Sequence, residues 1–167
     1  MYRCKSIGFS AYSCAAVILL ALVACPSAAW SRGPRCVHVT EGQIADLFAR
    51  WNDALQTGKA ANVVALYTSD AVLLPTLRNG PLIGHPAISK YFEEDFLPKK
   101  PVGAIDGPHN IRIGCNMAVD AGLYTFTFRK EGEKPAAARY TYVYKYDGGR
   151  WLIVHHHSSV RPEAPKP

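Results

Sequence analysis

Three consecutive histidines, His155, His156 and His157, lie near the end of the chain within an otherwise apolar run. A histidine can donate a hydrogen bond, and it can take up or release a proton near neutral pH. In a regular strand, alternation places His155 and His157 on one face, which Trp151 and Ile153 share. Because both faces carry apolar residues, we expect the histidines to be hydrogen-bonded, to line a cavity or to lie at an interface.

These histidines belong to a predicted β-hairpin over residues 138–159. Its first arm alternates tyrosines with other residues, the period of two that is typical of a strand. Residues 147–149 (Asp-Gly-Gly) can adopt positive φ and predict the turn. Arg139 lies on this arm, and its guanidinium could offer a planar fork to a carboxylate.

The histidines of the hairpin suit two further kinds of chemistry. His155 and His157 could hold a metal ion if a third ligand converged on them, but no carboxylate or cysteine is visibly placed to do so, and no metal site is predicted. Asp120 with His155 could form an acid–base pair. Asp120 also lies close to Gly122 at an expected bend, so a structural role in capping a turn is the alternative for this aspartate.

The length and charge of the chain suit one globular domain. It has 167 residues and a formal net charge of +6, and two of its basic residues, Arg3 and Lys5, precede an apolar run. The remaining basic residues are scattered along the chain. A nucleic-acid-binding surface is therefore not expected.

The first 29 residues predict export. Arg3 and Lys5 form a charged start, residues 11–24 are apolar but short for a membrane span, and small residues follow. Residues 1–29 are thus expected to be a signal peptide. In a second interpretation, residues 1–24 are removed and Cys25 carries lipid. Both place the domain in the periplasm or outside the cell, with the membrane reached only through a signal or lipid anchor.

Two cysteines remain after the predicted leader, Cys36 and Cys115. In an oxidising compartment such a pair indicates one disulfide, although two buried thiols are the alternative. Residues 30–36 are interpreted as a linker that leads into the domain.

The first half of the domain is predicted to be mainly helical. A capping box indicates a helix that begins after Thr40, with Gln43 as the reciprocal partner, and Gly58 suits its end. Further helices are expected over residues 60–67 and 86–96, separated by a small hairpin. The first helix carries its apolar residues at helical spacing: Ile44, Leu47, Phe48, Trp51 and Leu55.

The second half, from residue 102 onward, is predicted to be almost entirely strand. Helices followed by a meander of about four long antiparallel strands indicate an α+β domain. Its helices are expected to pack on one face of a curved antiparallel sheet.

Three stretches resemble the nuclear transport factor 2-like (cystatin-like) superfamily: Leu66–Pro75 (LYTSDAVLLP), His109–Cys115 (HNIRIGC) and Gly149–Ser159 (GRWLIVHHHSS). Within it, the chain is similar to the association-domain family of calcium/calmodulin-dependent protein kinase II and its exported bacterial relatives. The resemblance covers residues 37–162 and leaves 163–167 as a tail. Some such relatives are called SgcJ/EcaC family oxidoreductases. This chain has no GxGxxG loop and no flavin or haem signature, so no cofactor is expected.

The resemblance implies a cone in which three N-terminal helices pack on a strongly curved antiparallel sheet and leave a pocket between them. It also implies self-association into dimers or larger rings. Calmodulin is not an expected partner, because the sequence carries no kinase segment and is predicted to be exported.

Association domains line their pocket with arginines, so the resemblance suggests a site for a small acidic or polar molecule. The expected ligand-binding residues are Arg139, His155, His157, Trp51 and Tyr67. The superfamily also includes enzymes that need no cofactor. A cofactor-independent isomerase, dehydratase or cyclase using His155 and Asp120 is therefore the alternative. Alternation leaves open which sheet face looks inward, because a β-bulge would exchange the faces.

Overall fold

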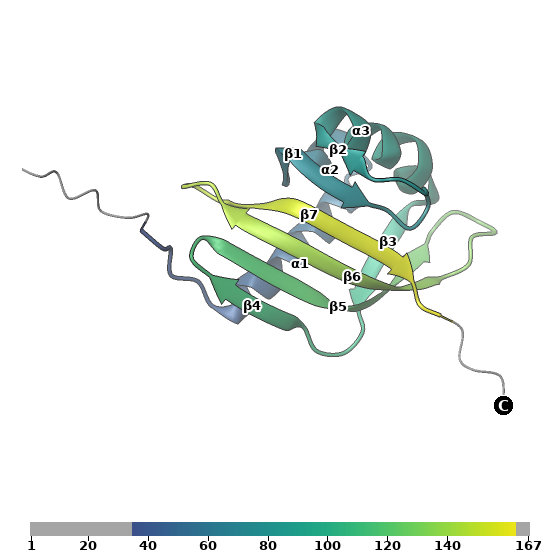
Figure 1. The fold of residues 1–167 in the computed structure, drawn as a ribbon. Helices are drawn as coiled ribbons and strands as arrows, with labels where there is room; N and C mark the ends of the chain where they lie inside the picture. Colours follow the sequence, from purple (N-terminus) through teal and green to yellow (C-terminus); the bar gives the residue numbers. More distant parts are fainter. Residues whose placement is uncertain (1–34, 163–167) are drawn as a thin grey trace, which may run out of the picture. The chain divides into compact units, whose positions relative to one another are not determined.

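The structure, a computed structural model, describes residues 35–162, which form a seven-stranded sheet with helices on one face (Figure 1). This is the α+β arrangement that the sequence predicts. The helices are α1 (Glu41–Gln56), α2 (Ala60–Val64) and α3 (Gly84–Tyr91). The strands are β1 (Tyr67–Leu74), β2 (Leu82–Ile83), β3 (Pro101–Ile105), β4 (Asn110–Gly114), β5 (Met117–Phe128), β6 (Ala136–Tyr146) and β7 (Trp151–Val160).

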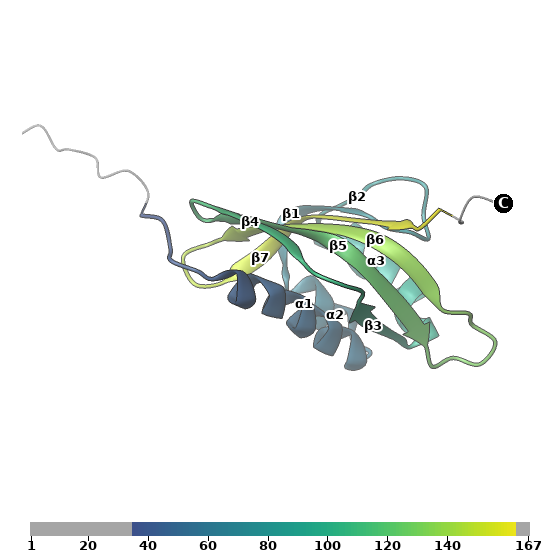
Figure 2. The ribbon, with the colours of Figure 1, turned by 90° about the horizontal axis from the view of Figure 1, so that it is seen from below.

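The strands are ordered β2-β1-β7-β6-β5-β3, and β4 also pairs with β5. Every pair is antiparallel except β1 with β7, which run parallel. β4 pairs with the first part of β5 and β3 with the last part, so β5 changes partner near Gly122. A Cβ atom on Gly122 would lie 2.9 Å from the Tyr140 hydroxyl oxygen, so the glycine makes room for that ring. Figure 2 shows the sheet curving around the helices beneath it.

α1 begins and ends as the sequence predicts, and it provides much of the core. Thr40 Oγ1 accepts a hydrogen bond from the Gln43 amide at 3.2 Å, and Gln43 Oε1 accepts one from the Thr40 amide at 2.9 Å. The predicted apolar stripe is buried against the sheet. At the other end Asn52 accepts a hydrogen bond from the Gly103 amide at 2.8 Å, which ties the helix to β3.

α3 is followed by a wider, π-helical turn over Phe92–Phe96 and a 3₁₀ turn over Leu97–Lys99. The sequence predicts one regular helix through this segment. The wider turn carries an extra residue, so it changes the direction in which the following side chains point. Phe92 and Phe96 are both buried, with ring centroids 6.1 Å apart.

The second predicted helix is too long by three residues. α2 ends at Val64, and residue 67 already belongs to β1, where Tyr67 pairs with Ile153 of β7. The Tyr67 side chain is 1% exposed and makes hydrogen bonds inside the core. Tertiary contacts of this tyrosine therefore outweigh the local helical pattern.

A disulfide joins Cys36 to Cys115, 79 positions apart in the sequence. Closing a loop of that length reduces the entropy of the unfolded chain. In the chain-entropy description this stabilises the folded state by about 4 kcal/mol. Asn116 supports the same junction, because its side chain accepts a hydrogen bond from the Val37 amide at 2.8 Å and donates one to the Arg35 carbonyl. The segment before α1 is thereby held against the turn that joins β4 to β5.

Several predictions lie outside the described residues: the signal peptide over 1–29, the lipidation of Cys25, most of the linker and the tail over 163–167. None of the helices between residues 35 and 162 combines the length and the apolar character that a membrane crossing requires.

Candidate functional site

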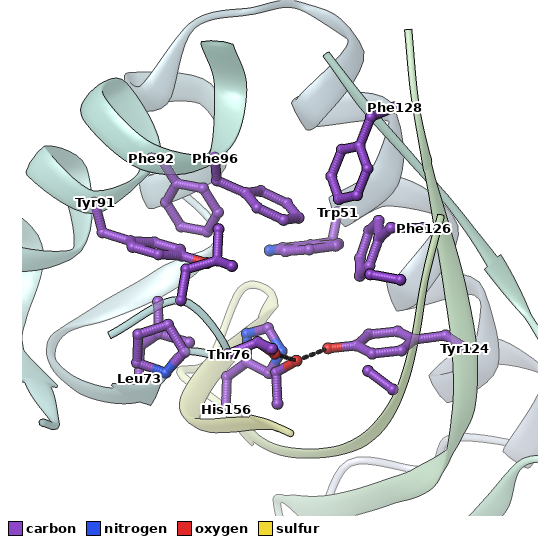
Figure 3. Close-up of a pocket in the computed structure, with 15 residues that line it drawn as sticks. Trp51, Leu73, Thr76, Tyr91, Phe92, Phe96, Tyr124, Phe126, Phe128 and His156 are labelled. Carbon is purple, nitrogen blue, oxygen red and sulfur yellow. Dashed lines mark hydrogen bonds between the residues drawn. The ribbon is translucent and has the colours of Figure 1, made fainter. Parts of the chain in front are cut away.

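A cavity opens between the helices and the concave side of the sheet (Figure 3). Residues from α1, the segment after β1, α3 with its π turn, and strands β1 and β5–β7 line it: Trp51, Leu73, Pro75, Thr76, Leu77, Tyr91, Phe92, Phe96, Tyr124, Phe126, Phe128, Ala136, Ala138, His156 and Ser158. None of them is an acid, a lysine or an arginine.

Two alanines in β6 help to create the space. On β5, Tyr124 and Phe126 point inward by strand alternation, and across the ladder they pair with Ala138 and Ala136. A methyl group opposite each ring leaves volume that a larger side chain would fill. In Figure 3, Phe92, Phe96 and Trp51 face His156 and Tyr124 across the opening.

A chain of three buried side chains holds the histidine of this cavity. Trp51 Nε1 donates to the Tyr67 hydroxyl oxygen at 3.0 Å, and that hydroxyl is 2.9 Å from His156 Nδ1. The indole can only donate, so the Tyr67 oxygen accepts from it and keeps one proton to give. Among residues 35–162, His156 Nδ1 is the acceptor placed to receive that proton. The proton of neutral His156 therefore resides on Nε2.

His156 is kept uncharged by its surroundings. Its side chain is 3% exposed, and the Tyr142 ring stacks on it with centroids 4.1 Å apart. Burial, together with smaller contributions from the neighbouring His157 and His155, lowers the pKa of His156 to about 3. At neutral pH His156 thus presents a fixed N–H donor, and no described residue accepts a hydrogen bond from Nε2.

A second polar patch in the cavity is formed by three hydroxyl groups that bond to one another. The Tyr124 hydroxyl donates to Ser158 Oγ at 2.5 Å, drawn as the dashed line in Figure 3, and Ser158 Oγ lies 2.5 Å from Thr76 Oγ1. Burial raises the pKa of Tyr124 well above its usual value, so this phenol stays protonated. These hydroxyls orient one another, whereas His156 Nε2 is the fully buried donor of the lining that has no partner among residues 35–162.

The structure does not bring the five predicted ligand-binding residues together. Trp51 lines the cavity, and Tyr67 lies behind it and orients His156. Arg139, His155 and His157 all lie on the face of the sheet that points away from the cavity. There Arg139 and His157 are exposed, and His155 is half-buried. The part of these three residues in ligand binding therefore stays a prediction.

A β-bulge explains this difference. Val143 pairs with His155, but the next residue, Tyr144, pairs with Ile153, so Val154 is an extra residue in β7. One extra residue reverses the alternation after it, which turns His156 inward and His155 outward. The bulge has no signature in the sequence. The alternating tyrosines of β6 were the available signal, because they mark the buried face on which His156 stacks.

Asp120 is buried, but its partner is not His155. Its Oδ2 lies 2.8 Å from His109 Nδ1, and its Oδ1 accepts a hydrogen bond from the Tyr140 hydroxyl at 3.2 Å. Burial raises the pKa of Asp120, while the contact with His109 lowers it. Asp120 does not line the cavity. The predicted Asp120–His155 acid–base pair is therefore not formed.

Within residues 35–162 the structure contains no group of three side chains placed to hold a metal ion.

Comparison with known proteins identifies the family. The sequence profile of the calcium/calmodulin dependent protein kinase II association domain matches residues 40–162. A structure from Xanthomonas campestris described as such an association domain is 44% identical, covers 76% of this chain and 91% of its own, and has a TM-score of 0.70. The chain therefore belongs to the association-domain family. A comparison with curated proteins found no match.

More distant structures show the fold. A nuclear transport factor 2-like superfamily protein from Salmonella enterica is 21% identical, covers 73% of this chain and 91% of its own, and has a TM-score of 0.63. A nuclear transport factor 2-like protein with a cystatin-like fold from Novosphingobium aromaticivorans is 13% identical, with coverages of 74% and 83% and a TM-score of 0.62. In general terms, family and fold define a small-molecule-binding or oligomerisation module. The likeness to the relatives called SgcJ/EcaC stays a prediction.

The low pKa of His156 predicts an acid-sensitive contribution to stability. Below pH 6.5 His156 takes up a proton in the unfolded state, whereas in the folded state the buried ring stays unprotonated. Acid therefore favours the unfolded state. Between pH 6.5 and 5 the free energy of unfolding should fall by about 2 kcal/mol more in the wild type than in His156→Gln. Urea unfolding of both proteins measures this. The raised pKa of Asp120 acts in the opposite direction but is common to both. Equal pH dependence in the two proteins would contradict the buried, neutral state.

Proposed function

We propose that this protein is an exported small-molecule-binding module whose ligand occupies the cavity beneath Trp51. The observation that carries the proposal is a cavity with aromatic walls, no charged lining residue and one buried donor, His156 Nε2, left without a partner. Native proteins rarely leave such a group unpaired, because its desolvation is costly. The disulfide between Cys36 and Cys115 supports export, since disulfides persist mainly in oxidising compartments.

Binding is favoured over catalysis by the chemistry of the lining. A cofactor-independent isomerase or dehydratase needs a base in contact with its substrate. The cavity has no lining carboxylate, and Asp120 is engaged elsewhere by His109 and Tyr140. His156 Nδ1 already accepts a hydrogen bond, so this ring can polarise a bound acceptor but has no free nitrogen to remove a proton.

We further propose that the protein associates with copies of itself through the uncovered face of the sheet. The described helices all lie on the other face (Figure 2). On the uncovered face, Met117 and Leu123 of β5 are exposed, and Val143 of β6 is half-buried. Arg139, His155 and His157 share this face, so an interface is a fitting role for them. Membership of the association-domain family supports the same proposal.

The binding proposal is tested with ethylbenzene, a small apolar probe, by isothermal titration calorimetry. The wild type should bind it in the cavity. Ala138→Leu should weaken binding at least tenfold, because the added carbon atoms occupy the space opposite Tyr124. Ala137→Leu is the matched control: Ala137 is the neighbouring residue of β6, and it points to the other face.

Two results would contradict the binding proposal. One is a wild type that does not bind the probe, and the other is equal weakening by Ala138→Leu and Ala137→Leu. Thermal unfolding of each variant establishes that it is folded before its binding is compared.

The assembly proposal is tested by sedimentation velocity. The wild type should sediment as a dimer or larger species, and Leu123→Glu should lower the mass towards one subunit, because it puts a charge at the centre of an apolar contact. Asn62→Glu, on the exposed side of α2, should leave the mass unchanged. A monomeric wild type, or an unchanged mass for Leu123→Glu, would refute the interface.

A further inference from the structure

We infer that the ligand of the cavity is an uncharged, largely apolar molecule that presents one hydrogen-bond acceptor, such as a carbonyl oxygen, to His156 Nε2. The inference rests on the proposed binding function and specifies the class of ligand. Of the acidic or polar ligands that the family resemblance suggests, it favours an uncharged one, because the structure supplies a neutral donor and no cation in the cavity lining.

The position of the donor follows from the hydrogen bonds around it. Trp51 donates to Tyr67, and Tyr67 donates to His156 Nδ1, so the remaining proton is on Nε2. Four buried side-chain atoms of residues 35–162 have no partner: Thr68 Oγ1, Tyr142 Oη, Tyr144 Oη and His156 Nε2. Of these four residues, His156 is the one that lines the cavity. An acceptor on the ligand would therefore satisfy this buried donor, which no described residue pairs with.

The lining excludes a charged ligand. No acid, lysine or arginine is among the lining residues, and the hydroxyls of Tyr124, Ser158 and Thr76 are already bonded to one another. His155 and His157 lie on the opposite face of the sheet. An anion in this cavity would lose its water without gaining a countercharge, which strongly disfavours binding.

The remaining surface selects for apolar, flat groups. Aromatic side chains form most of the wall: Trp51, Tyr91, Phe92, Phe96, Tyr124, Phe126 and Phe128. Phe96 contacts Phe126 edge to face, with ring centroids 5.1 Å apart, and both rings line the cavity. Such surfaces bind aromatic or alicyclic rings by burying apolar area and by ring contacts.

Three probes of similar size test the inference by calorimetry at pH 7: ethylbenzene, acetophenone and benzoate. Acetophenone adds one carbonyl acceptor to the apolar probe, and benzoate adds a negative charge. Acetophenone should bind about tenfold more tightly than ethylbenzene, because its oxygen pairs with the buried donor. Benzoate should bind more weakly than both.

Two substitutions locate the donor. His156→Asn keeps an acceptor near the position of Nδ1 for Tyr67 but has no donor at the position of Nε2. The affinity of this variant for acetophenone should therefore fall to its affinity for ethylbenzene. His156→Gln can place an amide donor near the position of Nε2, so it should retain most of the preference. Ethylbenzene binding, which uses no hydrogen bond, shows that each variant still forms the cavity.

The possible outcomes separate the two proposals. If ethylbenzene fails to bind the wild type, the binding function itself is overturned. If ethylbenzene binds but acetophenone is no tighter, or benzoate is the tightest, the cavity is a binding site and the inferred ligand class is wrong. A preference for acetophenone that His156→Asn leaves intact would place the acceptor elsewhere and would also overturn the inference.

Discussion

The hydrogen-bonded chain from Trp51 through Tyr67 to His156 is the constraint on which the site depends. It joins α1 and the nearby β1 to β7, whose His156 lies 89 positions after Tyr67, by two buried hydrogen bonds of 3.0 and 2.9 Å. The indole nitrogen can only donate, and His156 Nδ1 is the acceptor within reach of the Tyr67 proton among the described residues, so the two bonds run from Trp51 towards His156. Its last proton lies on His156 Nε2, which faces no acceptor among the described residues.

The sheet provides the space in which that donor is useful. β5 changes partner from β4 to β3 near Gly122, which allows the sheet to curve around α1, and Ala136 and Ala138 leave room opposite the aromatic rings of β5. The extra residue Val154 then turns His156 into that space. Curvature, small side chains and one bulge together make a cavity out of what would otherwise be packed core.

Much of the fold could be predicted from the sequence, and little of the site could. The capping box at Thr40, the apolar stripe of α1 and the alternating tyrosines of β6 are local patterns that burial enforces. The face of the sheet on which each histidine lies depends on the β-bulge at Val154. The bulge shifts the pairing of β7 with β6 and has no local pattern in the sequence. Alternation alone therefore leaves the inward face open, and it is the structure that places His156, and neither His155 nor His157, in the cavity lining. The partner of Asp120, likewise, was found only through the register of β4 with β5.

The most direct test of this account is the protonation of His156, read from the nitrogen chemical shifts of the protein labelled with ¹⁵N at histidine. Between pH 5 and 8 the account predicts a neutral ring whose Nε2 carries the proton and whose Nδ1 is unprotonated. Those shifts should not move over this range, because burial holds the pKa of His156 at about 3. A proton on Nδ1, or titration of the ring near pH 6.5, would contradict the central claim.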